Sequence, residues 1–386
     1  MTDDTDLTFP AALQSIPTPA LLVSRRVLMR NLDAMQSRAR RLGVDLRPHV
    51  KTHKCVEIAR LQAGGGARGL TVSTLAEARA FAAAGFDDLT LAVPLAAGKI
   101  RPALALARGL TLRLLLDDDG TLDALERRAA AAGFRPHVWL KIDCGYHRAG
   151  LDPDGPAAWA LARRLAASPH VVFDGLLTHA GHAYDAPGLQ RRRQIAAGER
   201  DAVTGLAGRL RAAGVPVPGV SVGSTPTLTA ADDLSGVTEV RPGNYVFFDL
   251  TQVALQSCEL ADIAVSVLAT VISHPPGGGR IVIDAGALAL SKDAGRQRDP
   301  SAFSMGAVCP DVASSRPDPS LRLTSLSQEH GIIQAAGPDD LDDRLPVGAR
   351  VRILPQHSCL ATACHDRALV IEDGRITGAW TIHRRR

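Results

Sequence analysis

The sequence predicts an α/β protein in two parts, a (β/α)8 TIM-type barrel followed by a mostly antiparallel β domain. In the first two thirds of the chain, short apolar segments alternate with longer ones in which Ala, Leu and Arg recur at helical spacing. After about Leu260 the helical spacing fades, and strand-like segments follow one another across Gly, Pro and Asp turns. We therefore place the barrel at residues 15–255 and the β domain at residues 256–386, which could also include the N-terminal segment.

The first part contains eight strand candidates, the number that a (β/α)8 barrel requires. They are Ala20–Val23, Val44–Val50, Gly69–Val72, Leu89–Val93, Leu112–Leu116, His137–Ile142, Val171–Leu177 and Val217–Val222. A doubly wound parallel sheet is the competing interpretation, because it alternates strands and helices in the same way. Polar residues just past the carboxyl ends of several candidate strands favour the barrel, since barrel enzymes assemble their sites at that face.

The second part contains six strand candidates. They are Ile263–Ser273, Arg280–Ala285, Leu321–Ser325, Ala349–Leu354, Ala368–Ile371 and Ile376–Ile382. The segment Gln297–Pro319 is rich in Gly, Pro and polar residues and predicts a long loop. A succession of strands with almost no helical spacing between them is typical of a separate β domain.

Composition and charge exclude several classes of protein. The 386 residues carry a formal net charge of only +4, and the basic residues are spread along helix-like segments, which argues against nucleic-acid binding. No run of about 18 apolar residues is present, so no membrane span is predicted. The six cysteines have irregular spacing, and the N-terminus is acidic and lacks the apolar core of a signal peptide. We expect a cytoplasmic enzyme with reduced thiols.

The segment from Arg47 to Lys54 gathers cationic side chains at the end of a predicted strand. Arg47, His49 and Lys51 share one parity, so in a strand all three would point to the same face. Charged side chains on an inner face are costly unless an anionic or electrophilic group lies opposite. A buried lysine has a lowered pKa and becomes the nucleophilic amine that Schiff-base chemistry needs. The alternative is a strand that ends in a basic, solvated turn.

Two later segments have the composition of a phosphate-binding site. Ser221–Thr227 follows the last predicted barrel strand, and its small residues, hydroxyls and amides could surround a dianionic phosphate. Arg241–Tyr245 follows with a glycine that permits close backbone approach, and could complete a phosphate cup. Late βα loops of barrels often bind phosphate. The alternatives are a tight turn with a helix cap for the first segment, and a change of chain direction for the second.

Another polar cluster, Lys141–Gly150, lies beyond the strand that begins at His137. Its basic and hydroxyl groups could hold an anionic oxygen of a cofactor. The alternative is a capped loop whose charges are incidental.

Near the C-terminus, His357 and Cys359 are separated by one residue. On an extended segment such a pair projects to the same side and can bind one Zn2+. Two protein ligands with open positions would describe a catalytic metal site, because structural zinc usually takes four. The alternative is an incidental pair near the end of the β domain.

Together these segments resemble the fold type III family of pyridoxal-phosphate enzymes, whose founding member is alanine racemase. The greater resemblance is to the branch that contains eukaryotic-type D-serine dehydratase, D-threonine aldolase and the 3-hydroxy-D-aspartate enzymes. It covers nearly the whole chain from Thr18 onward. The motifs that carry it are, in order, Arg-Pro-His-Val-Lys-Thr-His-Lys, Lys-Ile-Asp-x-Gly-x-x-Arg-x-Gly, Gly-Ser-Thr-Pro, Arg-Pro-Gly-Asn-Tyr, Glu-His-Gly and Pro-x-His-x-Cys. The ordered set is specific, although each motif alone is not.

The resemblance implies a role for each residue that matches a family motif. Lys51 is implied to form the Schiff base with pyridoxal 5'-phosphate, and Arg148 to hydrogen-bond the phenolic oxygen of this cofactor. The other cofactor-binding residues that it implies are His49, His179, Tyr184, Gly223, Ser224, Thr225, Arg241, Gly243, Asn244 and Tyr245. Arg241 and Tyr184 are alternative partners of the pyridine nitrogen, and both cannot be its primary partner.

The resemblance also implies the class of reaction. His357 and Cys359 match the zinc ligands of the dehydratases, whereas D-threonine aldolases carry His-x-Asp. Dehydration of a β-hydroxy-D-amino acid (D-serine, D-threonine or 3-hydroxy-D-aspartate) is therefore favoured over retro-aldol cleavage to glycine and an aldehyde, for which the metal could instead be Mn2+ or Mg2+. A racemase would need a second base, commonly a tyrosine from the β domain, and all three tyrosines lie in the barrel part.

Two further implications of the resemblance concern partners. A non-catalytic pyridoxal-phosphate carrier is the alternative from another class, but single-domain carriers lack both the β domain and the metal pair. The family also implies a homodimer whose β domain lies near the partner's site.

Overall fold

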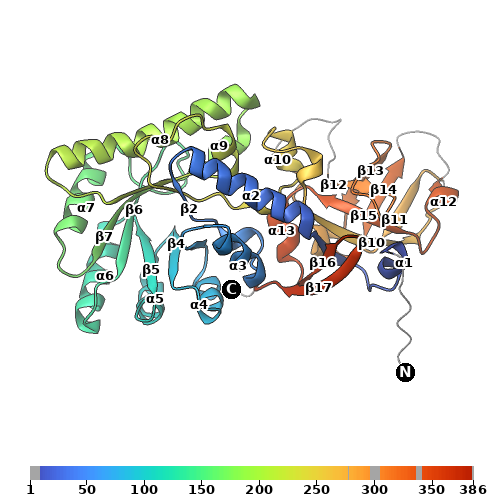
Figure 1. Ribbon diagram of the computed structural model, residues 1–386, viewed down its shortest axis with the longest axis horizontal. Helices are drawn as coiled ribbons and strands as arrows, with labels where there is room; N and C mark the ends of the chain where they lie inside the picture. Colours follow the sequence, from blue (N-terminus) through green and yellow to red (C-terminus); the bar gives the residue numbers. More distant parts are fainter. Residues whose placement is uncertain (1–8, 277, 296–304, 336–340, 385–386) are drawn as a thin grey trace. The chain divides into compact units, whose positions relative to one another are not determined.

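The computed structural model describes residues 9–276, 278–295, 305–335 and 341–384. The chain forms two compact units (Figure 1). The barrel unit consists mainly of Asp33–Lys51 and Val56–Gly243, and the β unit of Met1–Leu32, Thr52–Cys55 and Asn244–Arg384. Each unit is therefore assembled from segments that are far apart in the sequence.

The barrel unit contains eight parallel strands in the order β2-β9-β8-β7-β6-β5-β4-β3. They are β2 (Asp45–Leu46), β3 (Leu70–Val72), β4 (Asp88–Pro94), β5 (Thr111–Leu116), β6 (His137–Lys141), β7 (Val172–Leu177), β8 (Gly219–Val222) and β9 (Glu239–Val240). A parallel bridge between His49 and Thr71 connects the two ends of this order, and the Thr71 amide donates to the Pro48 carbonyl at 2.9 Å. The strands thus form the ring of a (β/α)8 barrel.

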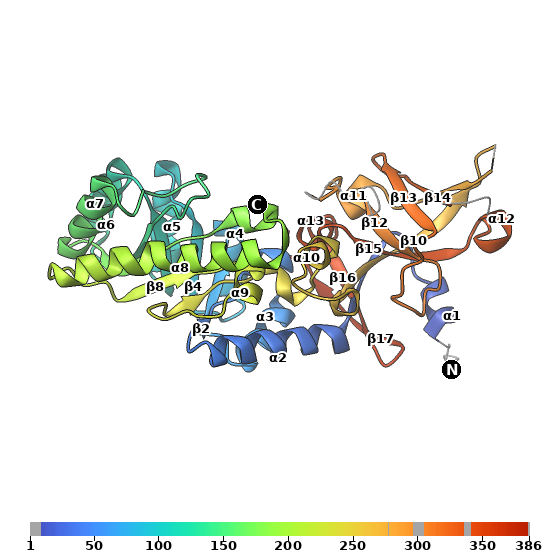
Figure 2. The same ribbon diagram turned by 90° about the horizontal axis from the view of Figure 1, so that it is seen from above.

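Helices cover the strands of the barrel unit. They are α3 (Val56–Gly64), α4 (Leu75–Ala83), α5 (Ile100–Ala107), α6 (Asp119–Ala132), α7 (Pro156–Ala167), α8 (Gly188–Ala212) and α9 (Thr225–Ala230), with short 3-10 turns η1 (Val50–Thr52), η2 (Ala97–Lys99) and η3 (Gly181–Asp185). Helix α5 packs on β5, α7 packs on β6 and β7, and α8 packs on β7. Helix α8 also packs on β8, beside which it runs in Figure 2. In β4, β6 and β8 the Leu and Val residues share one parity, so they lie on one face of each strand.

The predicted fold class is confirmed, although one barrel strand was expected in the wrong place. Ala20–Val23 forms β1 (Ala20–Ser24), which pairs with strands of the β unit and not with the barrel. The eighth barrel strand is instead β9 (Glu239–Val240), which is too short to give an alternating pattern. The predicted strand Val44–Val50 is wrong beyond Leu46, where only the isolated bridge at His49 continues the pairing.

The β unit contains a nine-stranded sheet in the order β11-β14-β13-β12-β15-β10-β1-β16-β17, with an additional pairing between β11 and β10. Its strands are β1, β10 (Val265–Ser273), β11 (Arg280–Ile283), β12 (Gly306–Cys309), β13 (Leu321–Leu326), β14 (Gly331–Ala335), β15 (Arg350–Pro355), β16 (Arg367–Glu372) and β17 (Arg375–Thr381). The additional pairing closes six of the strands into an antiparallel barrel, and β1, β16 and β17 extend the sheet from β10. Only β1 and β16 run parallel.

All six strands expected in the β domain are present, as β10, β11, β13, β15, β16 and β17. Two further strands, β12 and β14, were not expected. The predicted loop Gln297–Pro319 is wrong at Gly306–Cys309, which forms β12, and its residues 297–304 lie outside the described residues.

Short helices complete the β unit. They are α1 (Phe9–Gln14), α10 (Leu250–Ala254), α11 (Ala287–Leu290), α12 (Leu341–Arg344) and α13 (Ser358–Ala363), with the turns η4 (Asn244–Val246) and η5 (Leu260–Asp262). Helix α2 (Arg25–Arg41) continues from β1 and leads into the barrel unit.

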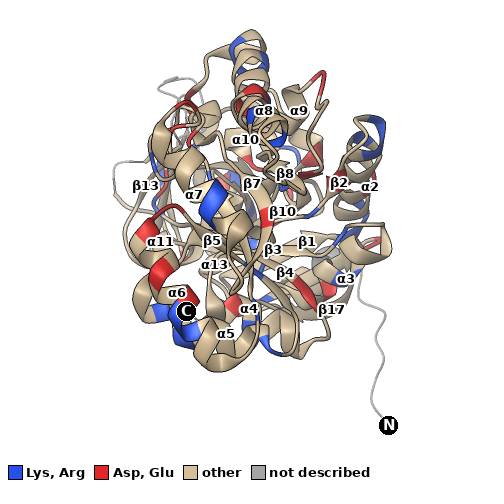
Figure 3. Cartoon of the chain, turned by 90° about the vertical axis from the view of Figure 1, so that its left-hand side faces the viewer, with Lys and Arg blue, Asp and Glu red and all other residues tan. Residues whose placement is uncertain are grey.

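Lys and Arg positions, coloured blue, and Asp and Glu positions, coloured red, both occur along the helices in Figure 3. Among the described residues, no helix is both long and apolar enough to cross a membrane.

Candidate active site

Lys51 lies in the 3-10 turn η1, past the carboxyl end of β2. The expected shared face with Arg47 and His49 is wrong, because the strand ends at Leu46 and the chain turns before Lys51. The Lys51 side chain is exposed, as in the alternative interpretation of a strand that ends in a basic turn. His49 remains beside it: the Lys51 amide donates to His49 Nδ1 at 3.4 Å.

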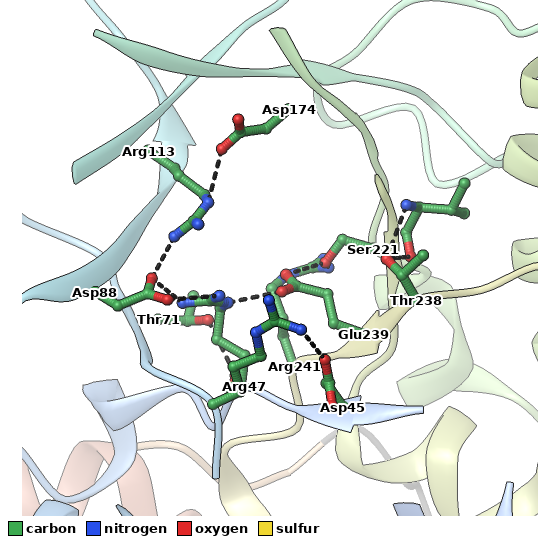
Figure 4. A network of polar contacts seen from close by, with 12 residues as sticks. Asp45, Arg47, Thr71, Asp88, Arg113, Asp174, Ser221, Thr238, Glu239 and Arg241 are labelled. Carbon is green, nitrogen blue, oxygen red and sulfur yellow. Dashed lines mark hydrogen bonds and ion pairs between the residues drawn. The ribbon is translucent and has the colours of Figure 1, made fainter. Parts of the chain in front are cut away.

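Arg47 belongs to a buried ionic network inside the barrel unit (Figure 4). Its Nε donates to Glu239 at 2.7 Å, and its terminal nitrogens pair with Asp88. Although burial lowers it, Glu239 and Asp88 together raise the pKa of the Arg47 guanidinium. Arg113 continues the network from Asp88 to Asp174. The carboxylates of Glu239 and Asp88 therefore compensate the charge of Arg47, and no bound ligand is needed for this. We infer that Arg47 has a structural role.

Arg148 is presented by a loop that Asp143 organises at the end of β6. The Asp143 carboxylate accepts the amide hydrogens of Gly145, Tyr146 and His147 at 3.0 Å each. These bonds hold a tight turn that ends in Arg148, whose guanidinium stacks over the Tyr146 ring at 4.9 Å.

Two glycines permit this loop to lie close to the barrel. A Cβ at Gly150, which has φ +107°, would lie 2.6 Å from the carbonyl carbon of Ile142. A Cβ at Gly181 would lie 2.2 Å from the Tyr146 ring. The packing of the loop therefore depends on the absence of side chains at both positions.

His179 follows β7 within a cluster of cations. Burial lowers the pKa of its imidazole well below the ordinary value, and the charges of Lys51, Arg148 and other nearby cations lower it further. His179 is therefore neutral at physiological pH. Such a concentration of positive charge at the carboxyl ends of barrel strands fits an anionic cofactor such as pyridoxal 5'-phosphate, so the donor set suits the group that the motifs imply.

Lys141 and Glu199 are buried members of the same region. Burial lowers the pKa of the Lys141 amine to about 8, and its Nζ donates to the Ile142 carbonyl at 3.0 Å. Glu199, on α8, accepts the amide hydrogens of Ala180 at 2.8 Å and Gly223 at 3.1 Å. One carboxylate thus connects the loop after β7 with the loop after β8.

The Gly223-Ser224-Thr225 segment forms a helix cap. The Ser224 hydroxyl accepts the Thr227 amide hydrogen at 3.3 Å, and the Ser224 amide donates to the Thr227 hydroxyl at 2.9 Å, which completes a capping box. The segment also lies at the carboxyl end of β8, beside the end of β9 that leads to Gly243. Its role in phosphate binding stays a prediction.

Arg241 is almost fully buried, and protein acceptors occupy its guanidinium. It donates to the Ser221 hydroxyl and to the Thr178 carbonyl, and Ser221 donates in turn to Glu239 at 2.7 Å (Figure 4). Burial lowers the pKa of Arg241 to about 10. Tyr184, the alternative partner of the pyridine nitrogen, lies in η3. Both assignments stay predictions.

The second group of candidate residues lies in the β unit, where β15 leads into α13. His357 precedes α13, and its Nδ1 lies 2.7 Å from the Asp293 carboxylate. Burial lowers the pKa of His357, but Asp293 and Cys359 raise it more, to about 11. The Asp293 bond leaves Nε2 as the nitrogen that could bind a metal.

The Cys359 thiol lies among polar side chains of the β unit. Its Sγ lies 3.2 Å from the hydroxyl of Thr52 and 3.7 Å from the amide nitrogen of Asn244. The side chain of Asn244, a residue expected at the phosphate, therefore lies beside Cys359. Tyr245, which was expected in the barrel part, belongs to the β unit and is buried. An imidazole with a carboxylate behind it and a thiol with hydrogen-bond donors nearby fit a zinc ion.

Among the described residues, no group of three or more His, Cys, Asp or Glu side chains gathers at a metal position. The pair would therefore supply two ligands. Sequence patterns did not identify the carboxylates of Asp293 and Glu199, because each stands alone in the sequence, with no spacing signal to a candidate site residue.

Comparisons with known proteins match the chain in two consecutive parts. Residues 23–251 match the family model “Alanine racemase, N-terminal domain”, and residues 264–371 match the model “Putative serine dehydratase domain”. The chain therefore belongs to the alanine racemase-like family of pyridoxal-phosphate enzymes, in the group whose members carry a serine dehydratase domain.

Three curated relatives show where in the family the chain lies. It is 42% identical to D-threo-3-hydroxyaspartate dehydratase of Delftia sp. (strain HT23), over 91% of this chain and 93% of that one. It is 35% identical to D-serine dehydratase of Dictyostelium discoideum (95% and 97% covered) and 30% identical to D-threonine aldolase of an Arthrobacter species (97% and 94%). The solved structure of the Delftia enzyme superimposes with a TM-score of 0.91, covering 96% of this chain and 98% of that one at 41% identity. All three relatives are lyases.

Proposed function

We propose that this protein is a pyridoxal-phosphate- and zinc-dependent dehydratase of a β-hydroxy-D-amino acid, which it converts to a 2-oxo acid and ammonia. The candidate substrates are D-serine, D-threonine and 3-hydroxy-D-aspartate. The observation that carries the proposal is that Lys51, Arg148 and His179 all lie past the carboxyl ends of barrel strands, namely β2, β6 and β7. Two of the three curated relatives are dehydratases of such substrates.

In the barrel unit, Lys51 would anchor the cofactor covalently and then act as the base that takes the α-proton. The bound cofactor supplies an electron sink for the pair left at Cα. Arg148, held by the Asp143 loop, would bind the phenolic oxygen, and the Gly223 and Gly243 loops would receive the phosphate. His179 would contact the ring without adding a charge, since its imidazole is neutral.

In the β unit, His357 Nε2 and Cys359 Sγ would hold the metal ion. Zinc supplies Lewis acidity, which makes a β-hydroxyl a better leaving group. Asp293 would fix the His357 tautomer, because a carboxylate on Nδ1 holds the proton at that nitrogen. Thr52, the residue that follows Lys51 in the sequence, lies against the Cys359 sulfur.

Retro-aldol cleavage is the second candidate reaction, because the D-threonine aldolase of Arthrobacter matches 97% of this chain. Incubation with D-serine, D-threonine and D-threo-3-hydroxyaspartate decides between the two. We expect a 2-oxo acid and ammonia. Glycine with an aldehyde would show an aldolase, and no turnover of any of the three would favour a carrier.

The cofactor assignment has its own test. Protein reconstituted with pyridoxal 5'-phosphate should show the near-visible absorbance band of the covalently held cofactor. The band should vanish in Lys51→Ala and persist in Lys54→Ala, a neighbouring lysine in the same motif. An unchanged band in Lys51→Ala would show that another residue carries the cofactor.

The metal, the oligomeric state and the compartment are further parts of the proposal. His357→Ala should abolish turnover, and a chelator should do the same to the wild-type protein unless zinc is restored. Sedimentation should show a homodimer, as the family implies, and fractionation should find the protein in the cytoplasm.

A further inference from the structure

The side chain of Asp249 is fully buried in the β unit, near the candidate metal ligands His357 and Cys359. Its Oδ1 accepts the amide hydrogen of Gln252 at 2.9 Å and so caps α10. Its Oδ2 accepts the amide hydrogen of Ser358 at 2.9 Å and the hydroxyl hydrogen of the same residue at 3.1 Å. Ser358 stands between the two candidate metal ligands in the sequence, so this carboxylate fixes the backbone from which both ligands project.

The same carboxylate orients the amide of Asn244. The Asn244 Nδ2 lies 2.6 Å from Asp249 Oδ2. An ionised carboxylate only accepts hydrogen bonds, so the NH2 end of the amide, and not its carbonyl, must face this side. The second hydrogen of that NH2 is then directed toward the Ser358 hydroxyl at 3.2 Å and Cys359 Sγ at 3.7 Å. A thiolate that binds a metal can also only accept a hydrogen bond, so the NH2 group of Asn244 is a suitable donor to the Cys359 sulfur.

His357 is held separately, by the Asp293 carboxylate at 2.7 Å. The two ligands therefore have different supports, which can be perturbed one at a time. None of the hydrogen bonds described for Asp249 reaches the side chain of His357 or Cys359, so its hydrogen bonds act on the pair through Ser358 and Asn244. Its charge also acts on His357 directly, and raises the pKa of that imidazole.

We propose that Asp249 is a positioning residue of the metal site, which sets the affinity for zinc by fixing Ser358 and by turning the NH2 group of Asn244 toward the Cys359 sulfur. The inference rests on the proposed function, because it requires His357 and Cys359 to bind the metal. Groups that orient metal ligands in this way commonly change metal affinity by roughly 10- to 100-fold.

The test measures binding of Zn2+ itself, by competition with a chromophoric chelator, in the full-length protein loaded with pyridoxal 5'-phosphate. Asp249→Asn keeps the size of the side chain but places a donor where Oδ2 accepts three hydrogen bonds. Ser358→Ala removes one of those bonds and leaves the carboxylate intact. Asp284→Asn is the matched control, because Asp284 also accepts a backbone amide hydrogen in the β unit, from Thr270 at 2.7 Å.

We expect the dissociation constant for Zn2+ to rise roughly 10- to 100-fold in Asp249→Asn, to rise severalfold in Ser358→Ala, and to stay unchanged in Asp284→Asn. Binding of Co2+ gives a second readout, since its thiolate absorption band should weaken in the first two variants. If Asp249→Asn fails to fold, the dissociation constant of Ser358→Ala for Zn2+ decides: a rise above the wild-type value supports the inference.

Two outcomes would overturn the inference, and they are distinguishable. Wild-type affinity in Asp249→Asn, or in Ser358→Ala where that variant decides, would remove Asp249 from the metal site and leave the proposed function intact. Equal zinc binding by the wild-type protein and His357→Ala would show that His357 does not bind the metal. The proposed metal site and the inference about Asp249 would then both be wrong.

Discussion

Arg47 is 2% exposed and lies between Asp88 and Glu239, so its charge is compensated only by the protein. Removing one partner of a buried ion pair costs about 3–5 kcal/mol, because the remaining charges lose their compensation. We expect Arg47→Ala to lower the free energy of unfolding in urea by about that amount. Arg68→Ala is the control, since Arg68 pairs with Asp45 on the surface and such pairs contribute less than about 1 kcal/mol. Equal losses in the two variants would contradict a structural role for Arg47.

Lys141 predicts a dependence of stability on pH in the cofactor-free protein. Burial, aided by Arg241 and Arg148, lowers the pKa of this amine from its ordinary value of 10.5 to about 8. Between pH 8 and 10.5 the unfolded state therefore binds more protons than the folded state, so the free energy of unfolding rises with pH. Below pH 8 both states are protonated, and the whole penalty for the buried charge remains, roughly 3 kcal/mol.

Lys141→Met removes this titration. The variant should be more stable than the wild type below pH 8, and the difference should shrink as the pH rises to 10.5. Urea unfolding at a series of pH values measures this difference in the free energy of unfolding. Lys99→Met is the control, because Lys99 is exposed. A difference that stays constant over the whole range would show that the folded protein does not depress this pKa.

Single residues differ in how well the sequence identifies them. Lys51, Arg148, His357 and Cys359 stand in motifs whose residue types and spacing are recognisable in the sequence itself. Asp249 could not be found in this way, because its carboxylate acts on Ser358, 109 positions further along the chain. The parity argument for Arg47 did not hold either, since it required a strand that continues past Leu46.

At the scale of elements, the loop after β6 depends on one aspartate. Asp143 accepts three amide hydrogens, and hydrogen bonds to charged groups contribute about 1.5–3 kcal/mol each. Asp143→Ala should therefore loosen the loop that carries Arg148. A loss of about 1.4 kcal/mol in binding raises the dissociation constant tenfold. We expect pyridoxal 5'-phosphate to bind roughly tenfold more weakly, as measured by absorbance titration.

Asp152→Ala provides the control for this loop. Asp152 accepts the Asp154 amide hydrogen at 3.0 Å in a neighbouring exposed turn, and it has no bond to the Arg148 loop among those described. Its cofactor affinity should match that of the wild type. Unchanged affinity in Asp143→Ala would show that the loop keeps its form without the carboxylate.

Strand predictions succeeded where segments were long and apolar, as in β5, β6 and β7. They failed at β9, where two residues cannot show a period, and at β1, where the apolar run Leu21-Leu22-Val23 fits a buried strand of either sheet. The partners of β1 decide its place, and those partners lie more than 240 residues further along the chain.

At the scale of the whole molecule, a division at residues 15–255 and 256–386 separates β1 from the strands on both sides of it, unless the β domain also includes the N-terminal segment, the alternative that the sequence left open. β1 pairs antiparallel with β10 through Ala20–Val23, and parallel with β16 through Leu21–Ser24. A fragment that starts at residue 256 would therefore lack the strand that joins β10 to β16, and both would expose unpaired backbone groups.

We therefore expect a fragment of residues 256–386 to remain unfolded or to aggregate. A fragment of residues 244–386 preceded by residues 9–32 through a flexible linker should fold, because it restores β1 and the apolar cluster of Leu13, Ile16, Leu22 and Leu268. Circular dichroism and urea unfolding distinguish the two fragments. A cooperative transition in the shorter fragment would show that β1 is dispensable, and that the division at residue 256 is a true domain boundary.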